Sequence, residues 1–264
     1  MRHRRVIGGA SAAALLGFDG FRGQAWPLVW SAPHTSRPAP NVFRTRNWRE
    51  PLLVGEHLVA HPAVVLRQLG MQYVDLEGRD DRLCAPDRIE LATEHALRAA
   101  MVNLTELRPG GGGNIGDRTL ATVLGRRGDE PPTESYAETR AVQAFRSWGW
   151  QCWRQLPVVD GSRIVQRVDF VLPFGEYGRR PPLITADTGL LIEIDGRQFH
   201  DGTFEQDHKR QSNYDRLGLH WISLTPTQIE HGGQRTRLAI DGALRRAQRG
   251  ILPMQPNSRA MQPN

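Results

Sequence analysis

The sequence predicts the α/β fold class, arranged as two domains along 264 residues. Apolar residues make up 39% of the chain and charged residues 23%, which is typical of globular domains and unlike disordered or membrane proteins. In the second half, strand-like apolar runs are interleaved with runs of helical spacing in the order α-β-β-β-α-β. A change of composition near the middle of the chain favours two domains over one.

The predicted N-terminal domain covers residues 1–108 and is the smaller unit, basic and mixed α/β. Residues 58–70 predict a turn and a short helix that ends at Gly70. Residues 87–108 predict one long helix with Asp87 as its N-terminal cap. Small and apolar residues give this helix its spacing: Ile89, Ala92, His95, Ala96, Ala99 and Ala100.

Residues 109–132 are predicted to be a linker rich in Gly and Pro that contains one short helix. The linker opens with the run PGGGGNIGD, which differs from a phosphate-binding P-loop. A P-loop needs Lys followed by Ser or Thr after its last glycine and a strand before its first, and this run has neither. The domain boundary is therefore placed here.

The predicted C-terminal domain covers residues 133–250. Its first helix begins at Thr133 or Ser135, and Ser135 and Glu138 are spaced as a capping box. A hairpin over 153–174 turns at residues 160–162 and is followed by a strand at 190–195. A helix over 203–218, a strand over 220–224, a short helix and a final basic helix complete the domain, and residues 251–264 are a frayed tail.

The charge of the chain favours a nucleic-acid partner. The formal net charge is +6 and the isoelectric point is near 10.1. Of the 34 basic residues only Lys209 is lysine, so the codon bias of a GC-rich genome is a competing explanation. Residues 1–49 carry eight arginines against one acid, Asp19, and are the expected extra contact with DNA.

Cysteine content and hydropathy indicate a cytoplasmic protein. Cys84 and Cys152 are isolated, which gives neither a cysteine-based zinc cluster nor a disulfide framework. The first 18 residues imitate a signal peptide, but their apolar stretch is interrupted by glycine and serine. No apolar run approaches the length that spans a bilayer, so no membrane partner is expected.

Two carboxylates on consecutive predicted strands point to metal chemistry. In the strand LLIEID, Glu193 and Asp195 share one face, and Asp169 lies on the preceding strand. Mg²⁺ takes carboxylate and carbonyl oxygens as ligands, here Asp169, Glu193 and the carbonyl of Ile194. Such an ion, Mg²⁺ or Mn²⁺, polarises a phosphate and lowers the pKa of an attacking water.

The same residues resemble the PD-(D/E)xK nuclease superfamily. More closely, residues 133–230 resemble the uncharacterised endonuclease-like family related to the very short patch repair endonuclease, which implies a restriction-endonuclease-like core. The match is carried by Glu138, Gln155-Leu156-Pro157, Val168-Asp169-Phe170, Ile192-Glu193-Ile194-Asp195-Gly196, His200, Asp207, Arg210 and Leu217.

The resemblance implies metal ligation by Asp169 and Glu193, with Glu138, or Glu134 on the same helix, orienting the metal's waters. His200 falls where the repair enzyme has a catalytic histidine and is the candidate general base, and Gln155 would lie beside the metal.

The signature lysine of the superfamily would occupy position 195, where this chain has Asp195. Its positive charge would come from His200, Lys209 or Arg210, or the site would bind a second metal. The expected contacts with nucleic acid are Lys209, Arg210, Arg167 and Arg197.

Each of these residues also has a structural interpretation. Asp195 could cap the turn at Gly196, His200 could be a surface histidine, and Glu138 could serve only its capping box. Asp207 and Arg210 are spaced for an ordinary helix salt bridge.

Residues 1–132 resemble, more loosely, the region that follows the winged helix in abortive-infection type antitoxins. The similar stretches are SAAALLGFDGF, VFRTRNW, LVAHPAVVLRQLG and ELATEHALRAAMVNLTELR. The expected function is a metal-dependent endonuclease that hydrolyses DNA phosphodiesters. The alternative is a decayed nuclease fold that acts as a DNA-binding or antitoxin-like regulator, and the sequence does not separate DNA from RNA.

Overall fold

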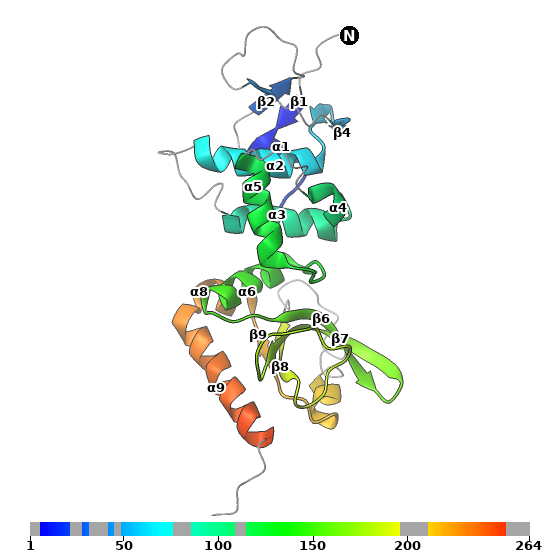
Figure 1. Ribbon diagram of the computed structural model, residues 1–264, viewed down its shortest axis with the longest axis vertical. Helices are drawn as coiled ribbons and strands as arrows, with labels where there is room; N and C mark the ends of the chain where they lie inside the picture. Colours follow the sequence, from blue (N-terminus) through cyan, green and yellow to red (C-terminus); the bar gives the residue numbers. More distant parts are fainter. Residues whose placement is uncertain are drawn as a thin grey trace, which may run out of the picture. The chain divides into compact units, whose positions relative to one another are not determined.

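The structure is a computed structural model that describes residues 6–21, 28–31, 42–44, 49–75, 86–108, 115–195 and 211–251 (Figure 1). The chain divides into two compact units, Met1–Thr139 and Arg140–Asn264. Each unit combines helices with a sheet that contains both parallel and antiparallel pairs, which confirms the α/β class.

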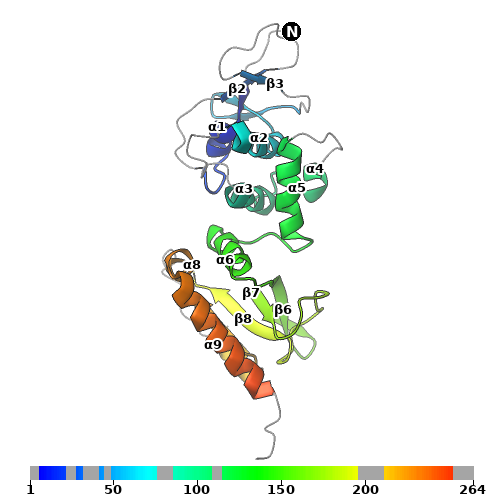
Figure 2. The same cartoon turned by 60° about the vertical axis from the view of Figure 1, so that its left-hand side comes forward.

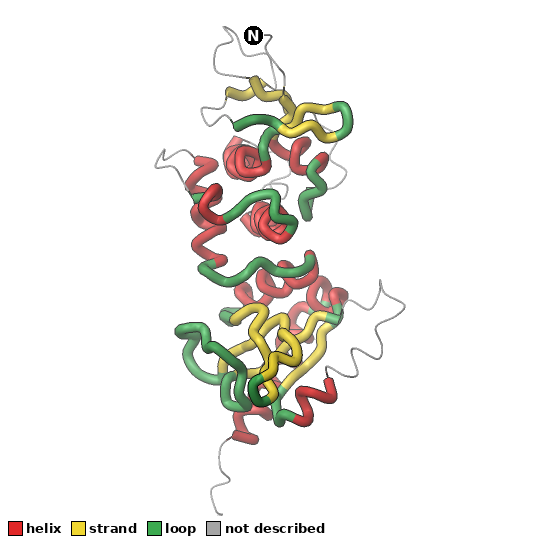
Figure 3. The backbone as a smooth tube through the Cα atoms, turned by 90° about the vertical axis from the view of Figure 1, so that its right-hand side faces the viewer, coloured by secondary structure: helices red, strands yellow, loops and turns green. Residues whose placement is uncertain are grey.

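The first unit contains a five-stranded sheet in the order β3-β2-β1-β5-β4. Its strands are β1 Val6–Gly8, β2 Leu28–Ser31, β3 Val42–Arg44, β4 Leu52–Val54 and β5 His57–Val59. β1 lies in the middle of the sheet, antiparallel to β2 and parallel to β5. The tube in Figure 3 shows these short strands beside the helices of the unit.

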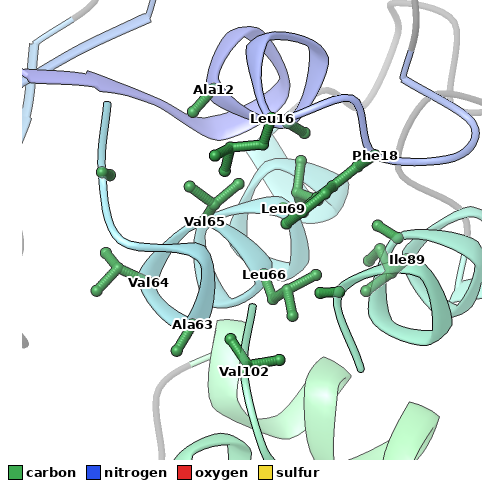
Figure 4. Packing of buried hydrophobic residues seen from close by; sticks show 14 of the residues in the cluster. Ala12, Leu16, Phe18, Ala63, Val64, Val65, Leu66, Leu69, Ile89 and Val102 are labelled. Atoms are coloured by element: carbon green, nitrogen blue, oxygen red, sulfur yellow. The ribbon is translucent and has the colours of Figure 1, made fainter. Parts of the chain in front are cut away.

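The helices of the first unit are α1 Gly9–Leu15, α2 Pro62–Asp75, α3 Pro86–Arg98, α4 Leu104–Leu107 and α5 Ile115–Arg127. Buried apolar side chains from these helices and from the loop after α1 form one core. Figure 4 shows Phe18 against Leu69 of α2, with Leu66 on the next turn and Ile89 of α3 close by.

Helix α2 does not end at Gly70 as predicted; it continues to Asp75. A Cβ at Gly70 would lie 2.9 Å from the carbonyl oxygen of Gly116 and 3.0 Å from Cβ of Thr119. Gly70 therefore allows close packing of α2 against α5. Glycine occurs both at helix ends and where two helices approach closely, and the sequence alone does not distinguish the two cases.

The long helix predicted over 87–108 is two helices. α3 ends at Arg98, and Ala100 adopts a left-handed φ of 52°. Asn103 then starts α4 by accepting a hydrogen bond from the backbone N–H of Glu106, whose side chain accepts one from the backbone N–H of Asn103.

The predicted linker over 109–132 also differs from the structure, because α5 belongs to the core of the first unit. Leu120 and Val123 are fully buried. Arg127 at the end of α5 forms a 3.1 Å ion pair with Glu94 of α3, and both side chains are 1% exposed. Glu94 also accepts a hydrogen bond from the backbone N–H of Thr133, which ties the chain after α5 to α3.

The second unit contains a four-stranded sheet in the order β6-β7-β8-β9. The strands are β6 Trp153–Asp160, β7 Arg163–Pro173, β8 Gly189–Ile194 and β9 Trp221–Leu224. β6, β7 and β8 pair antiparallel, and β8 pairs parallel with β9. The predicted hairpin is confirmed, since Asp160 pairs with Arg163 across the turn.

Helices cover both faces of this sheet. α6 Tyr136–Ser147, α8 Pro226–His231 and α9 Gly233–Ile251 contribute to one apolar cluster, which includes Phe170 and Ile192 (Figure 2). A second cluster contains Leu191 and the fully buried Tyr214, which lies in the helical segment 211–216. Neighbouring residues of β8 thus enter opposite cores, as strand alternation requires.

None of the helices in the part of the chain that the structure describes has the length and hydropathy needed to cross a bilayer. The predicted tail covers 251–264; Ile251 is the last residue of α9, and residues 252–264 lie outside the described residues.

Candidate active site

Asp169 and Glu193 lie close together on neighbouring strands. The antiparallel pairs of β7 and β8 run from Pro173↔Gly189 to Phe170↔Ile192, and Asp169 and Glu193 are the next residues on each strand. The Asp169 side chain bonds to the backbone of Ile194, directly after Glu193, and the charges of both carboxylates raise the pKa of Tyr214. The structure therefore brings together the two carboxylates that the sequence predicts as metal ligands, and both are half-buried.

The carboxylate of Asp169 is bound to the backbone of β8. Its Oδ2 accepts a 2.8 Å hydrogen bond from the N–H of Ile194. This N–H lies beyond the last regular pair of β7 and β8. The Asp169 carboxylate therefore accepts the hydrogen bond that a backbone carbonyl of β7 would accept in a regular ladder. The bond fixes one oxygen of Asp169 and with it the direction of the other.

Glu193 is held by Tyr214. The Tyr214 hydroxyl donates a hydrogen bond to Oε1 of Glu193. Tyr214 has no exposed surface, and its ring lies 5.9 Å from that of Trp221. Burial, and then the charge and hydrogen bond of Glu193, raise the pKa of Tyr214 far above its usual value, so the hydroxyl stays a donor.

Two more polar side chains lie beside this pair. Asn213 Nδ2 donates a 3.5 Å hydrogen bond to Oε1 of Gln166, and Gln166 lies close enough to the Tyr214 hydroxyl to affect its pKa. Sequence reasoning predicted the helix that contains Tyr214 and Asn213 but did not single these residues out. A tyrosine on the apolar side of a helix looks like an ordinary core residue, and only its contact with Glu193 distinguishes it.

Gln155 lies on β6, between the pairs Arg154↔Phe170 and Leu156↔Val168, and so faces Asp169. Its φ is 50°, a left-handed conformation that costs a residue with a side chain about 1–3 kcal/mol. The residue is 6% exposed, and its carbonyl accepts a 3.1 Å hydrogen bond from Arg180. Gln155 thus lies on the strand next to Asp169, and its place beside a metal stays a prediction.

The left-handed residue also interrupts the alternation of side chains between the two faces of β6. Trp153 and Leu156 are three residues apart on β6, yet both belong to the cluster around Tyr214. Strict alternation would place them on opposite faces of the sheet, so the alternation reverses once between them, as it does at a β-bulge.

Asp195 directly follows β8. Its backbone N–H donates a 2.8 Å hydrogen bond to the carbonyl of Leu224, which pairs with Ile194 on the parallel strand β9. The half-buried Asp195 is therefore held at the same end of the sheet as Glu193. The turn residue Gly196, which Asp195 could cap, lies outside the described residues.

Glu138 takes part in the N-terminal cap of α6. Its Oε1 accepts a 2.9 Å hydrogen bond from the Ser135 hydroxyl, and its Oε2 accepts a 2.8 Å bond from the N–H of Glu134. Ser135 in turn accepts from the N–H of Glu138, which confirms Ser135 as the cap. The capping role of Glu138 is thus established, and its role at a metal stays a prediction.

The predicted nucleic-acid contacts fall mostly outside the described residues. Arg167 is exposed on β7, two residues before Asp169. The remaining residues of the predicted constellation lie in the segment 196–210, which the structure does not describe: Arg197, His200, Asp207, Lys209 and Arg210.

The donor set fits a small hard cation. Within the described ranges, no three His, Cys, Asp or Glu side chains are grouped as a metal site. Two carboxylates and one carbonyl are nevertheless enough for Mg²⁺, which keeps several waters. Ligating carboxylates are commonly oriented by hydrogen bonds from other residues, as Ile194 and Tyr214 orient Asp169 and Glu193.

Comparison with protein-family models, with curated proteins and with solved structures finds no match to this chain.

Proposed function

We propose that the chain is a metal-dependent endonuclease that hydrolyses DNA phosphodiester bonds. One observation carries the proposal: Asp169 and Glu193 lie close together on neighbouring strands, and one oxygen of each accepts a hydrogen bond from the protein. Half-buried carboxylates side by side repel each other, and a cation between them removes that cost.

The order of elements in the second unit supports the PD-(D/E)xK interpretation. α6 is followed by the antiparallel strands β6, β7 and β8, then by the helical segment 211–216 and by β9, parallel to β8. This is the α-β-β-β-α-β order that the resemblance implies, with the two carboxylates on its second and third strands. We therefore propose a restriction-endonuclease-like core for this unit.

Asp169, Glu193 and the Ile194 carbonyl would hold Mg²⁺ or Mn²⁺. The ion supplies charge stabilisation to the scissile phosphate and a water of lowered pKa. Ile194 N–H and Tyr214 fix the ligands before the substrate arrives, which reduces the reorganisation that binding requires. His200 remains the candidate base, and Lys209 or Arg210 the candidate source of positive charge in place of the missing lysine.

The direct test is nicking of supercoiled plasmid with Mg²⁺ or Mn²⁺. The proteins compared are the wild type and the isosteric variants Asp169→Asn and Glu193→Gln. Asp187→Asn is the matched control, because Asp187 is an exposed loop carboxylate of the same unit. We expect nicking by the wild type and the control alone. Absence of nicking by the wild type, or equal nicking by all four proteins, contradicts the proposal.

A second candidate function follows from Asp195, which places a carboxylate where the superfamily has lysine. In this interpretation the fold has lost catalysis and binds DNA as a regulator, in keeping with the antitoxin-like first unit. DNA binding that ignores Mg²⁺ and is unchanged in Glu193→Gln, without any cleavage, would favour it. The isolated cysteines suit a reducing compartment, so we place either activity in the cytoplasm.

A further inference from the structure

Helix α9 has one apolar face and one strongly basic face. Thr236, Ile240, Ala243 and Ala247 are buried, and Ile240 and Ala243 enter the cluster shared with β7 and β8. Figures 1 and 2 show α9 lying lengthwise along its unit. Since the buried residues recur at spacings of three and four, the other side of the helix faces solvent.

That solvent side is an arginine face, defined by Arg235, Arg245, Arg246 and Arg249, all of which are exposed. Arg237, half-buried, is a fifth arginine on α9, and Asp241 is the one acidic residue of the helix. Among the described residues, none of these six side chains takes part in an ion pair.

This lack of pairing distinguishes α9 from other arginines of the protein. Arg67, Arg98, Arg127 and Arg216 each lie within 3.1 Å of a carboxylate. On α9, by contrast, Arg245 and Arg249 are one turn apart, a like-charge spacing that costs an isolated helix about 0.2–0.5 kcal/mol. The helix thus carries a concentrated charge that the described part of the protein does not neutralise.

We propose that the arginine face of α9 binds the phosphate backbone of duplex DNA. Arg235 and Arg249 are separated by fourteen residues, about 21 Å along the helix at 1.5 Å per residue. A duplex presents one negative charge for about every 1.7 Å of its axis, so several phosphates lie within this span. Arginine donates in a planar fork that suits phosphate oxygens.

The composition of α9 argues for a duplex over other polyanionic surfaces. Proteins that bind single strands add aromatic side chains for base stacking, and residues 233–251 contain no Phe, Trp or Tyr. A helix that lies on a membrane needs an exposed apolar face, but the apolar face of α9 is buried in the core. Among the α9 residues whose burial is described, Leu238, 54% exposed, is the one large apolar side chain that lies among the arginines.

The arginine face is separate from the candidate active site. α9 packs with Ile192 on one face of the sheet, whereas Tyr214 and its bond to Glu193 belong to the other. Binding at α9 therefore does not require cleavage, and it would hold DNA through a surface that the acidic pair does not share.

The experiment measures DNA binding by the full chain in EDTA, using fluorescence anisotropy with a short labelled duplex across about 50–200 mM KCl. The test variant replaces Arg245, Arg246 and Arg249 with Ala. The control variant replaces Arg108, Arg118 and Arg126, three exposed arginines of the first unit, and changes the net charge equally. Alanine favours helix and the three α9 side chains are exposed, so thermal unfolding should show an intact fold.

We expect the α9 variant to bind at least about tenfold more weakly near 100 mM KCl, and its slope of log K against log salt to be smaller by about 2–3. The control variant loses the same net charge as the α9 variant but keeps the arginine face. Its affinity should therefore remain within about twofold of the wild type. Equal weakening of both variants, an unchanged slope, or equally tight binding of a single strand would overturn the proposal. Asp169→Asn keeps the arginine face and removes one negative charge, so in EDTA it should bind DNA at least as tightly as the wild type while it loses nicking. Loss of nicking and loss of binding are therefore distinguishable.

Discussion

The substitution Tyr214→Phe isolates the hydrogen bond that orients Glu193. It removes the hydroxyl that donates to Oε1 of Glu193 and keeps the buried ring and its packing against Trp221. Loss of a hydrogen bond that orients a metal ligand commonly lowers metal affinity or activity by about 10- to 100-fold. We expect a nicking rate reduced by that factor, with a matching rise in the Mn²⁺ concentration that gives half-maximal rate.

The effect on stability is smaller and depends on pH. A hydrogen bond to a charged group contributes about 1.5–3 kcal/mol, and removal of a buried hydroxyl recovers part of this, so the variant should lose about 1–2 kcal/mol at neutral pH. The pKa of Tyr214 is raised above its usual 10.0. Above pH 10, Tyr214 ionises in the unfolded chain and stays protonated in the folded protein. The free energy of unfolding of the wild type therefore falls by about 1.4 kcal/mol per pH unit. The phenylalanine variant has no group that ionises at this position and shows no such fall.

Urea unfolding at pH 8, 10 and 11 checks this reasoning, with Tyr136→Phe as the control because Tyr136 is 40% exposed. The difference between wild type and Tyr214→Phe should shrink as the pH rises above 10, and the control should show no such change. A constant difference would mean that the hydroxyl is not held protonated in the folded protein. Unchanged nicking by Tyr214→Phe would refute its role in positioning Glu193.

Four further substitutions test the fold and the site. Gly70→Ala should lower the free energy of unfolding by about 1–3 kcal/mol because of overpacking between α2 and α5, whereas Gly125→Ala on open α5 surface should raise it by about 0.5–1 kcal/mol, both measured in urea. Glu94→Gln should cost about 3–5 kcal/mol in the same assay, since it removes the carboxylate from a buried ion pair with Arg127. Gln155→Gly should leave the free energy of unfolding unchanged or raise it, because glycine accepts the left-handed backbone. The same variant should slow nicking. A large loss of stability would show that the Gln155 side chain is needed for folding.

The parts of the structure that follow from local sequence were predictable. The turn at residues 160–162 fixes the pairing of β6 with β7, and strand alternation places Glu193 on a definite face of β8. The prediction that Asp169 and Glu193 lie close together needed only the further assumption that β7 and β8 are neighbours. For this reason the acidic pair could be identified before the fold was known.

The parts that depend on contacts distant in sequence were not predictable. Tyr214 contacts Glu193 because of the way in which the helical segment 211–216 packs against β8. The helical periodicity of the sequence does not say which residue of the segment will meet Glu193. The break after α3 depends on the left-handed turn at Ala100, a residue whose intrinsic preference is for helix. Tertiary packing decided both cases against the local pattern.

The separation of the acidic pair from α9 has a consequence for the two candidate functions. A change that ends catalysis at Glu193 acts on one face of the sheet and leaves the apolar contacts of α9 on the other face intact. Under the two proposals, such a change abolishes hydrolysis and leaves the binding of DNA by α9, which is the state that the second candidate function describes. DNA binding and nicking measured on the wild type and on Glu193→Gln decide between the candidates. If the chain is an enzyme, the variant loses nicking and keeps binding. If it is a regulator, both proteins bind DNA and neither nicks it.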